Sequence, residues 1–398
     1  MKNIIITGGE LFNKGAQAMT FIAVDELHRR FPNHQLYLLS EMDMERPTEE
    51  KACFNFEFMG WYPLKFAKCQ TNTLLRLSCL IKNGAELKAA ESIYQNCEAM
   101  VDISGYALSS DWSDSTCNHY LDHLEFAEAF HIPVYLMPQS FGPFNFGPER
   151  EDLDYRIRKL LPAAKMIFAR EQEGYDALIK QYDLTNVHLA NDLVLSNKEV
   201  DLSRVFRTVP KIALPQISEN SVAVIPNNMN TIASSNEETV YLYSEIIRVL
   251  LGLGKKVYLI SHSTMDKDLC RTLKCAFRDD KMVILQEQEF SCLEFNELVK
   301  HFQFLVASRF HAIVHAYKNS VPCVVLGWAT KYHALLKQFG QEQYALDIRN
   351  GVEVVEMQRA ISQMNQKYLK ESKTISDILQ TVQKENTFDT ISIVQEGT

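Results

Sequence analysis

The stretch that decides the fold is ASRFHAIVHAYKNSVPCVVLGWATKYHAL, residues 307–335. The apolar run just before it, residues 302–306, is typical of a buried parallel strand. Ser308 is expected to cap a helix, because apolar side chains then recur at helical spacing as far as Asn319. A second apolar strand follows over residues 321–326. The stretch therefore predicts a strand–helix–strand unit of an α/β protein.

The start of this helix predicts an anion site. In such a unit the helix N-terminus lies at the carboxyl edge of the sheet, where open α/β sheets bind ligands. Arg309 and His311 occupy the first turn, and Lys331 follows the second strand. The unpaired N–H groups of the helix, its dipole and these side chains would together attract an anion.

Length and composition set the outer limits of the interpretation. A chain of 398 residues is long enough for two hydrophobic cores. The net charge of −9 argues against nucleic acid as the main partner. The start, MKNIIITGGE, is typical of a first strand and not of a signal peptide. The nine cysteines lack CxxC spacing, which indicates reduced thiols and a cytoplasmic protein.

Loops at the ends of predicted strands in the first half supply further candidates. The loop after the first strand, residues 8–18, contains Asn13, Lys14 and Gln17 as ligand-binding side chains, but it lacks the GxGxxG spacing of nicotinamide-binding loops. Gln139 and Arg170 follow two later strands, and Asp111 is either a helix cap or an acid in the cleft. The predicted binding and catalytic residues of this half are Asn13, Lys14, Gln17, Asp111, Gln139 and Arg170.

The second half repeats the alternation of strands and helices. Residues 198–220 contain Pro210 and Pro215, lose apolar periodicity and are interpreted as a linker. We therefore predict two Rossmann-like domains, 1–200 and 201–398, that face each other across a cleft as in GT-B-like proteins. The first would be the acceptor side, and the second would hold the anion site and end in a helical tail.

Three short motifs resemble the signatures of the polysaccharide pyruvyl transferase family. The first is Arg-Phe-His at 309–311, followed by Val-Pro, an apolar strand and Lys331. The other two are Gln-x-x-Gly-Pro at 139–143 and Asn-x-Gly at 13–15. The chain departs from the family pattern at Phe310, where relatives usually carry Leu, and at Glu171, where they carry Asp. Ala16 and Gln17 stand where relatives carry Asp-Glu.

The resemblance implies transfer of the enolpyruvyl group of phosphoenolpyruvate onto two hydroxyls of one sugar, giving a ketal in exopolysaccharide or capsule biosynthesis. No cofactor is expected. Arg170, Arg309 and His311 would hold the donor, with help from Lys331, and Asp111 or His311 would donate the proton. Two alternatives stay open: a glycosyltransferase that uses nucleotide sugars, and a non-catalytic relative that binds a sugar or an anion.

Two further features concern partners. Between Trp61 and Lys82 there are four basic residues, several aromatic residues and no acid. This pattern is that of a helix packed on the core, or of a patch that contacts the inner face of the membrane, where a lipid-linked acceptor would be found. His311 and His315 lie four residues apart, but they lack a third ligand, so no metal is predicted.

Overall fold

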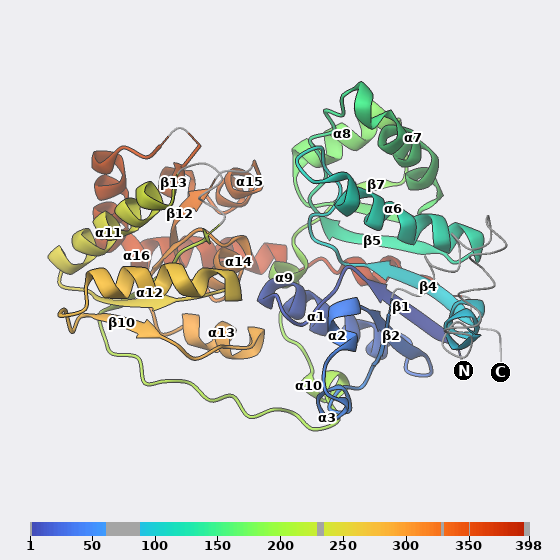
Figure 1. Ribbon diagram of the computed structural model, residues 1–398, viewed down its shortest axis with the longest axis horizontal. Coiled ribbons are helices and arrows are strands. Elements are labelled where there is room, and N and C mark those ends of the chain that lie inside the picture. The colour runs from blue at the N-terminus through green and yellow to red at the C-terminus, as the bar shows by residue number, and fades with distance from the viewer. Residues whose placement is uncertain (1, 61–87, 229–234, 328–329, 350, 394–398) are drawn as a thin grey trace.

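The protein is described here by a computed structural model that covers residues 2–60, 88–228, 235–327, 330–349 and 351–393. Two α/β halves lie side by side (Figure 1). Each is built on one sheet whose strands pair in parallel, so the expected class and two-part architecture are confirmed. Buried runs such as Ile4–Ile6 and Val222–Ile225 are apolar on both faces, which is what a sheet covered by helices on both sides requires.

The first half contains a seven-stranded sheet of order β3-β2-β1-β4-β5-β6-β7. Its strands are β1 (Asn3–Thr7), β2 (Gln35–Leu39), β3 (Glu57–Met59), β4 (Cys97–Asp102), β5 (Val134–Gln139), β6 (Met166–Ala169) and β7 (Val187–Leu189). Its described helices are α1 (Lys14–Arg30), α2 (Glu41–Met44), α3 (Thr48–Lys51), α6 (Asp114–Ala129), α7 (Glu151–Leu160) and α8 (Gln172–Tyr182); α9 (Leu193–Ser196) and α10 (Leu202–Val205) follow.

The second half contains a six-stranded sheet of order β10-β9-β8-β11-β12-β13. Its strands are β8 (Ser221–Ile225), β9 (Lys256–Ile260), β10 (Val283–Gln286), β11 (Leu305–Ala307), β12 (Cys323–Gly327) and β13 (Ala345–Asp347). Its described helices are α11 (Asn236–Gly252), α12 (Lys267–Ala276), α13 (Cys292–Val299), α14 (Phe310–Lys318), α15 (Thr330–Gln338) and α16 (Val354–Val382).

Both sheets have the strand order of a Rossmann fold, and in both the order reverses beside the first strand. The reversal lies between β1 and β4 in the first half and between β8 and β11 in the second. At such a point the loops leave neighbouring strands in opposite directions and open a crevice for a ligand. Each half therefore has one such crevice at the carboxyl edge of its sheet.

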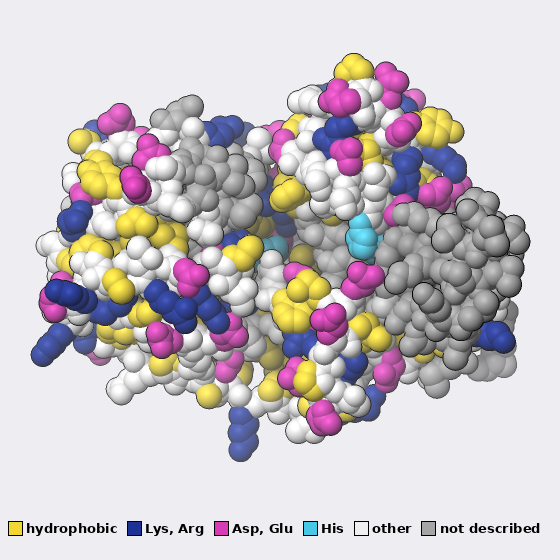
Figure 2. Space-filling view, in the orientation of Figure 1, with side chains coloured by type: hydrophobic (Ala, Val, Ile, Leu, Met, Phe, Trp, Pro, Cys, Tyr) yellow, Lys and Arg dark blue, Asp and Glu magenta, His cyan; other side chains and the backbone are white. Residues whose placement is uncertain are grey.

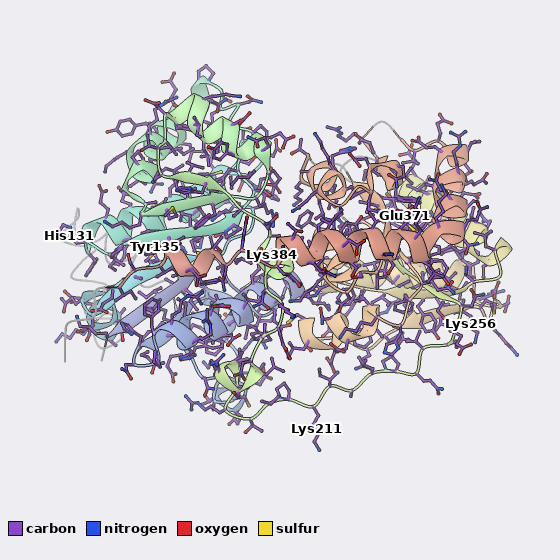
Figure 3. The ribbon with its side chains drawn as sticks, turned by 180° about the vertical axis from the view of Figure 1, so that it is seen from behind. His131, Tyr135, Lys211, Lys256, Glu371 and Lys384 are labelled. Carbon is purple, nitrogen blue, oxygen red and sulfur yellow. The ribbon has the colours of Figure 1, made fainter. Side chains whose placement is uncertain are left out.

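The halves are joined by more than the linker. The linker, residues 207–220, is a largely exposed segment without helix or strand that runs along the lower side of the molecule in Figures 1 and 3 and contains Lys211. On the other side α16 spans toward the first half, and Lys384 lies just beyond its end (Figure 3). The predicted division at residue 200 falls between β7 and β8, but the last described residues return to the first half.

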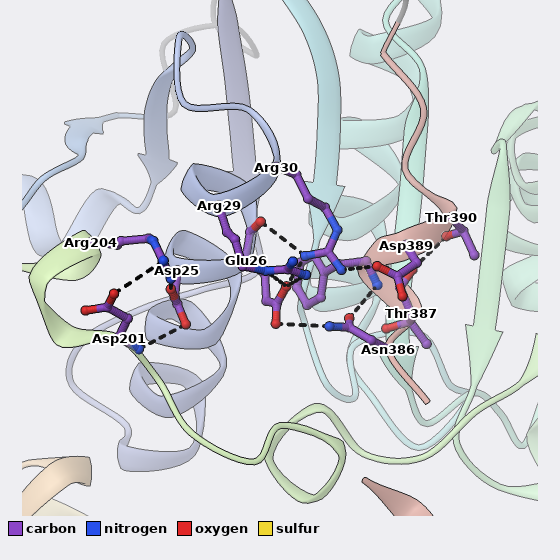
Figure 4. A network of polar contacts seen from close by, with 11 residues as sticks. Asp25, Glu26, Arg29, Arg30, Asp201, Arg204, Asn386, Thr387, Asp389 and Thr390 are labelled. Atoms are coloured by element: carbon purple, nitrogen blue, oxygen red, sulfur yellow. Dashed lines mark hydrogen bonds and ion pairs between the residues drawn. The ribbon is translucent and has the colours of Figure 1, made fainter. Parts of the chain in front are cut away.

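The returning tail is held by apolar and polar contacts. Phe388 is buried in a core that also contains residues of α1 and α14, and the Tyr135 hydroxyl donates to the Ser392 carbonyl at 3.1 Å. Arg30 on α1 pairs with Asp389, and Asn386 donates to Glu26 at 3.0 Å (Figure 4). The tail thus fastens α16 to the first domain.

One local prediction was wrong. Ser308 does not cap α14, because its hydroxyl is buried against the Tyr243 hydroxyl at 2.6 Å. Arg309 is the N-cap residue instead, and its side chain makes no capping hydrogen bond. Within the part of the chain that the structure describes, the N-cap side chain of α14 therefore makes no capping hydrogen bond.

Candidate active site

A cavity of about 700 Å³ lies where the two halves meet, and the molecular surface is hollowed between them (Figure 2). Loops after β1 and β4 line it from the first half, and loops after β8, β9 and β11 line it from the second. The two switch-point crevices have thus combined into one space. Its lining includes Gly8, Glu10, Asn13, Ser104, Tyr106, Trp112, His119, Arg170, Asn227, His262, Arg309, His311 and Lys331.

Arg309 is held at the start of α14 by a buried carboxylate. Its Nε and Nη2 donate to the two oxygens of Asp266 at 2.9 and 2.6 Å, and Asp266 is completely buried. A planar guanidinium with two parallel bonds to a carboxylate has a fixed orientation. Arg309 is therefore preorganised beside the uncapped end of α14.

Arg170 reaches the same cavity from the first half. Its Nη1 donates to Asp192 at 2.8 Å, and its Nε lies within hydrogen-bonding distance of Ser140 and Glu171. Its guanidinium also stacks over the Phe310 ring at 4.5 Å, so a residue of the first half contacts the first turn of α14. The prediction that Arg170 and Arg309 share one site agrees with this geometry.

These ion pairs determine what the two arginines can offer a ligand. Their charges are already balanced by carboxylates, but Arg170 Nη2 and Arg309 Nη1 take part in none of the hydrogen bonds found among the described residues. The arginines therefore present oriented N–H donors more than net positive charge. The first N–H groups of α14 add further donors of the same kind.

Lys331 has a different environment. Its Nζ lies 4.8 Å from the centre of the Tyr106 ring and 5.3 Å from that of Phe310, so rings from both halves surround it. Among the described residues no carboxylate lies within ion-pair distance of it. Burial lowers the pKa of Lys331 to about 7, and the guanidinium of Arg170 adds to the lowering.

His311 packs against the loop of the other half. A Cβ atom at Gly15 would lie 2.2 Å from the Cγ of His311, so only glycine leaves room for this ring. Burial lowers the pKa of His311 to about 4, which leaves the ring neutral at pH 7. The histidine can bind an anion through an N–H group, but it carries no charge there.

Asn13 both caps a helix and lines the cavity. Its Oδ1 accepts a hydrogen bond from the Gly15 amide at 2.9 Å and so caps α1. Four other predicted ligand or catalytic residues do not line the cavity. Lys14 donates to the His262 carbonyl at 2.7 Å, and Gln17 accepts from the Cys292 amide at 2.7 Å. Both side chains bridge the two halves.

The other two of these four residues lie within the first half. Gln139 is fully buried and donates to Asp102 at 3.0 Å. Asp111 is exposed, and its carboxylate accepts from the Tyr106 hydroxyl at 3.3 Å. Asp111 thus lies behind a cavity residue and not in the wall itself.

Several lining residues of the first half were not predicted from the sequence, among them Glu10, Tyr106, Trp112 and His119. Glu10 directly follows the Gly8-Gly9 pair at the end of β1, and Tyr106 follows Ser104-Gly105 after β4. Their positions directly after strands could have identified both as residues at the carboxyl edge of the sheet. Trp112 and His119 lie before and on α6, and nothing in the local sequence distinguishes them from packing residues.

Two other predictions concern metals and membranes. Among the described residues no group of three or more His, Cys, Asp or Glu side chains has the arrangement of a metal site. In the same part of the chain no helix has both the length and the apolar surface needed to cross a bilayer. The basic and aromatic segment between Trp61 and Lys82 lies outside the described residues.

Comparison with solved structures supports the fold. MnaA of S. aureus in a co-structure with UDP aligns with a TM-score of 0.60 at 10% identity, over 94% of this chain and 91% of that one. The UDP-GlcNAc 2-epimerase of Methanocaldococcus jannaschii aligns with a TM-score of 0.57 at 15% identity, over 96% and 100%. UGT71G1 of Medicago truncatula, complexed with UDP-glucose, gives 0.54 at 12% identity, over 96% and 94%. At such identities the likeness establishes the GT-B-like fold alone.

Sequence comparison identifies the family. No curated protein sequence matches the chain. The sequence model of polysaccharide pyruvyl transferases, however, matches residues 13–330, which include all three motifs except Lys331 and most of both halves. The chain therefore belongs to the polysaccharide pyruvyl transferase family.

Proposed function

We propose that the protein transfers the enolpyruvyl group of phosphoenolpyruvate onto two hydroxyls of one sugar, forming a pyruvate ketal and releasing phosphate. The observation that carries the proposal is the meeting of Arg170 and Arg309, one from each half, beside Lys331 and the uncapped start of α14. Phosphoenolpyruvate carries a phosphate and a carboxylate, both attached to C2, and two oriented guanidinium groups suit such a pair of anions.

The environment of Lys331 makes it the best candidate for the proton donor. The reaction requires a proton at C3 of the donor while the acceptor oxygen attacks C2. His311 is neutral near pH 7, and Asp111 does not line the cavity. Lys331 has a pKa of about 7, which is close to the optimum for general acid catalysis at neutral pH. A bound anionic donor would further favour its ammonium form.

The first-half wall is the proposed acceptor side. Trp112 and Tyr106 provide ring surfaces that suit the apolar faces of a sugar, and Glu10 and His119 provide polar groups. A lipid-linked acceptor used at the inner face of the membrane fits the basic and aromatic composition around Lys65 and Lys68. Co-sedimentation with anionic vesicles tests that contact, and it should weaken with salt and in a folded Lys65→Glu/Lys68→Glu variant.

Two experiments test the central proposal. Phosphoenolpyruvate, and not a UDP-sugar, should raise the melting temperature of the purified protein. Phosphate should be released when phosphoenolpyruvate is supplied with a panel of lipid-linked saccharides. Stabilisation by a UDP-sugar alone would favour the glycosyltransferase alternative. Donor binding without phosphate release on any acceptor would favour the non-catalytic relative.

A further inference from the structure

Glu10 carries a carboxyl group in the part of the cavity lining that follows β1. It is half-buried, it lines the cavity, and its side chain makes no ion pair or hydrogen bond among the described residues. The nearby cation Arg46 is already bound to Asp43 at 2.6 Å and to Glu50 at 3.2 Å. A carboxyl group that loses solvent without gaining a cation is costly, so its retention in the cavity needs an explanation.

The backbone before Glu10 is tightly constrained. Gly8 has a φ of +71°, and a Cβ there would lie 2.1 Å from the Ser104 hydroxyl oxygen. A Cβ at Gly9 would lie 2.6 Å from the Thr20 hydroxyl oxygen. The turn is thus packed between β4 and α1, and it places Glu10 at the switch point between β1 and β4. A rigid support of this kind is what a reacting side chain requires.

We infer that Glu10 is the general base that removes the proton from the attacking hydroxyl of the acceptor. This inference rests on the proposed function, because it assigns a role to Glu10 within that reaction. Arg170 and Lys331 both lie over the Phe310 ring next to Arg309 and are assigned to the donor, whereas Glu10 lines the same cavity from the loop after β1 and is left for the acceptor. Burial raises the pKa of Glu10, and the nearby carboxylate of Asp43 adds to the rise, so Glu10 is a stronger base than an exposed glutamate.

The proton balance can be written for both steps. In the first, the hydroxyl proton passes to Glu10 as its oxygen bonds to C2, and the C2=C3 electrons take a proton from the Lys331 ammonium at C3. In the second, the other hydroxyl bonds to C2 and gives its proton to the neutral amine of Lys331. The C2–O bond to phosphate breaks, both electrons leave with the phosphate, and this phosphate takes the proton held by Glu10. Both side chains return to their starting states.

The test compares three variants at position 10 with a charge-matched control. Glu10→Gln has nearly the same shape but cannot accept the proton, so kcat should fall about 100-fold or more while the affinity for phosphoenolpyruvate stays within twofold. Glu10→Ala should be equally slow and should regain activity when formate is added, because a small carboxylate can occupy the vacated space. Glu10→Asp should lie between the wild type and Glu10→Gln. Glu45→Gln removes an exposed carboxylate of the same half outside the cavity and should leave kcat unchanged.

The outcomes separate this inference from the proposed function. If the wild type releases phosphate and Glu10→Gln retains its kcat, Glu10 is not the base, although the proposed function stands. If Glu10→Gln loses donor affinity and formate restores nothing to Glu10→Ala, the residue supports the fold and is not catalytic. If the wild type itself shows no turnover with any acceptor, the proposed function fails first.

Discussion

Replacing Gly15 by alanine should disable the enzyme without unfolding it. The added Cβ would lie 2.2 Å from Cγ and 2.3 Å from Nδ1 of His311, whereas ordinary contacts begin near 3.4 Å. The histidine ring or the start of α14 must therefore move by about 1.2 Å. Because Arg309 of the proposed donor clamp precedes α14 and Gly15 belongs to the opposite half, we expect the movement to widen the cavity between the halves.

The expected loss of rate follows from this displacement. A misplacement of about 1 Å in a reacting geometry can cost about 100-fold in rate, so kcat/KM should fall by roughly that factor, or about 2.7 kcal/mol. Overpacking at the contact should cost about 1–3 kcal/mol of folding stability, partly offset by the better helix propensity of alanine in α1. The rate loss should therefore be accompanied by only a modest fall in melting temperature.

The assay is phosphate release under saturating and limiting phosphoenolpyruvate, with melting temperature measured on the same samples. Gly252→Ala is the matched control, because a Cβ at this last residue of α11 meets nothing within 4 Å and should leave kcat/KM unchanged. The double variant Gly15→Ala/His311→Ala removes the two ring contacts at 2.2 and 2.3 Å and keeps only the Cβ contact at 2.7 Å, so it should melt above Gly15→Ala. Wild-type kcat/KM in Gly15→Ala would refute the docking of His311 on this loop.

Three shorter predictions concern individual contacts. Arg309→Lys keeps a charge beside Asp266 but loses the guanidinium fork, so phosphoenolpyruvate affinity measured by calorimetry should fall about tenfold, and unchanged affinity would remove Arg309 from the clamp. In the wild type kcat/KM should decrease above pH 7 as the Lys331 ammonium is lost. Lys331→Arg should bind the donor and turn over about 100-fold more slowly at every pH. Normal turnover in this variant would exclude Lys331 as the acid. Gln17→Glu should retain activity, because a glutamate can still accept the hydrogen bond from the Cys292 amide. Gln17→Ala loses this bond and should lose about 1 kcal/mol of stability by thermal melting. Equal stability of Gln17→Ala and the wild type would show that the bond contributes nothing.

The fold and the common position of the two arginines could be predicted because they depend on local rules. Alternating apolar strands and helices define parallel sheets, and residues after such strands lie at the carboxyl edge. Arg170 and Arg309 satisfy this rule, and both line the cavity. The same rule also applied to Glu10, but a single carboxyl after a Gly-Gly pair does not indicate a reacting group without knowledge of its surroundings.

The direction in which each loop side chain faces could not be predicted, because it depends on how the halves dock. Lys14 and Gln17 lie beside Asn13 in the sequence, yet they contact the other half while Asn13 lines the cavity. Gln139 follows its strand as expected but turns inward to Asp102, a buried carboxylate that needs hydrogen-bond donors. Ser308 is similarly taken up by Tyr243 from a distant helix.

The contact made by Gln17 also bears on whether this chain has lost the chemistry of its family. Gln17 stands where relatives carry the Glu of an Asp-Glu pair, and Ala16 stands where they carry the Asp, a change that invites the interpretation of a non-catalytic relative. Here the residue at position 17 accepts a hydrogen bond from the first amide of α13 and so joins the halves. A glutamate carboxylate could accept the same bond, and it would also suit the positive end of that helix. An acid at position 17 can therefore be explained by helix capping across the interface between the halves. Because residue 17 does not line the cavity, the change from Glu to Gln there removes no proton-transferring group from it. The cavity retains its own ionisable groups, Glu10 from the first half and Lys331 from the second, so the substitution at position 17 is compatible with an active enzyme.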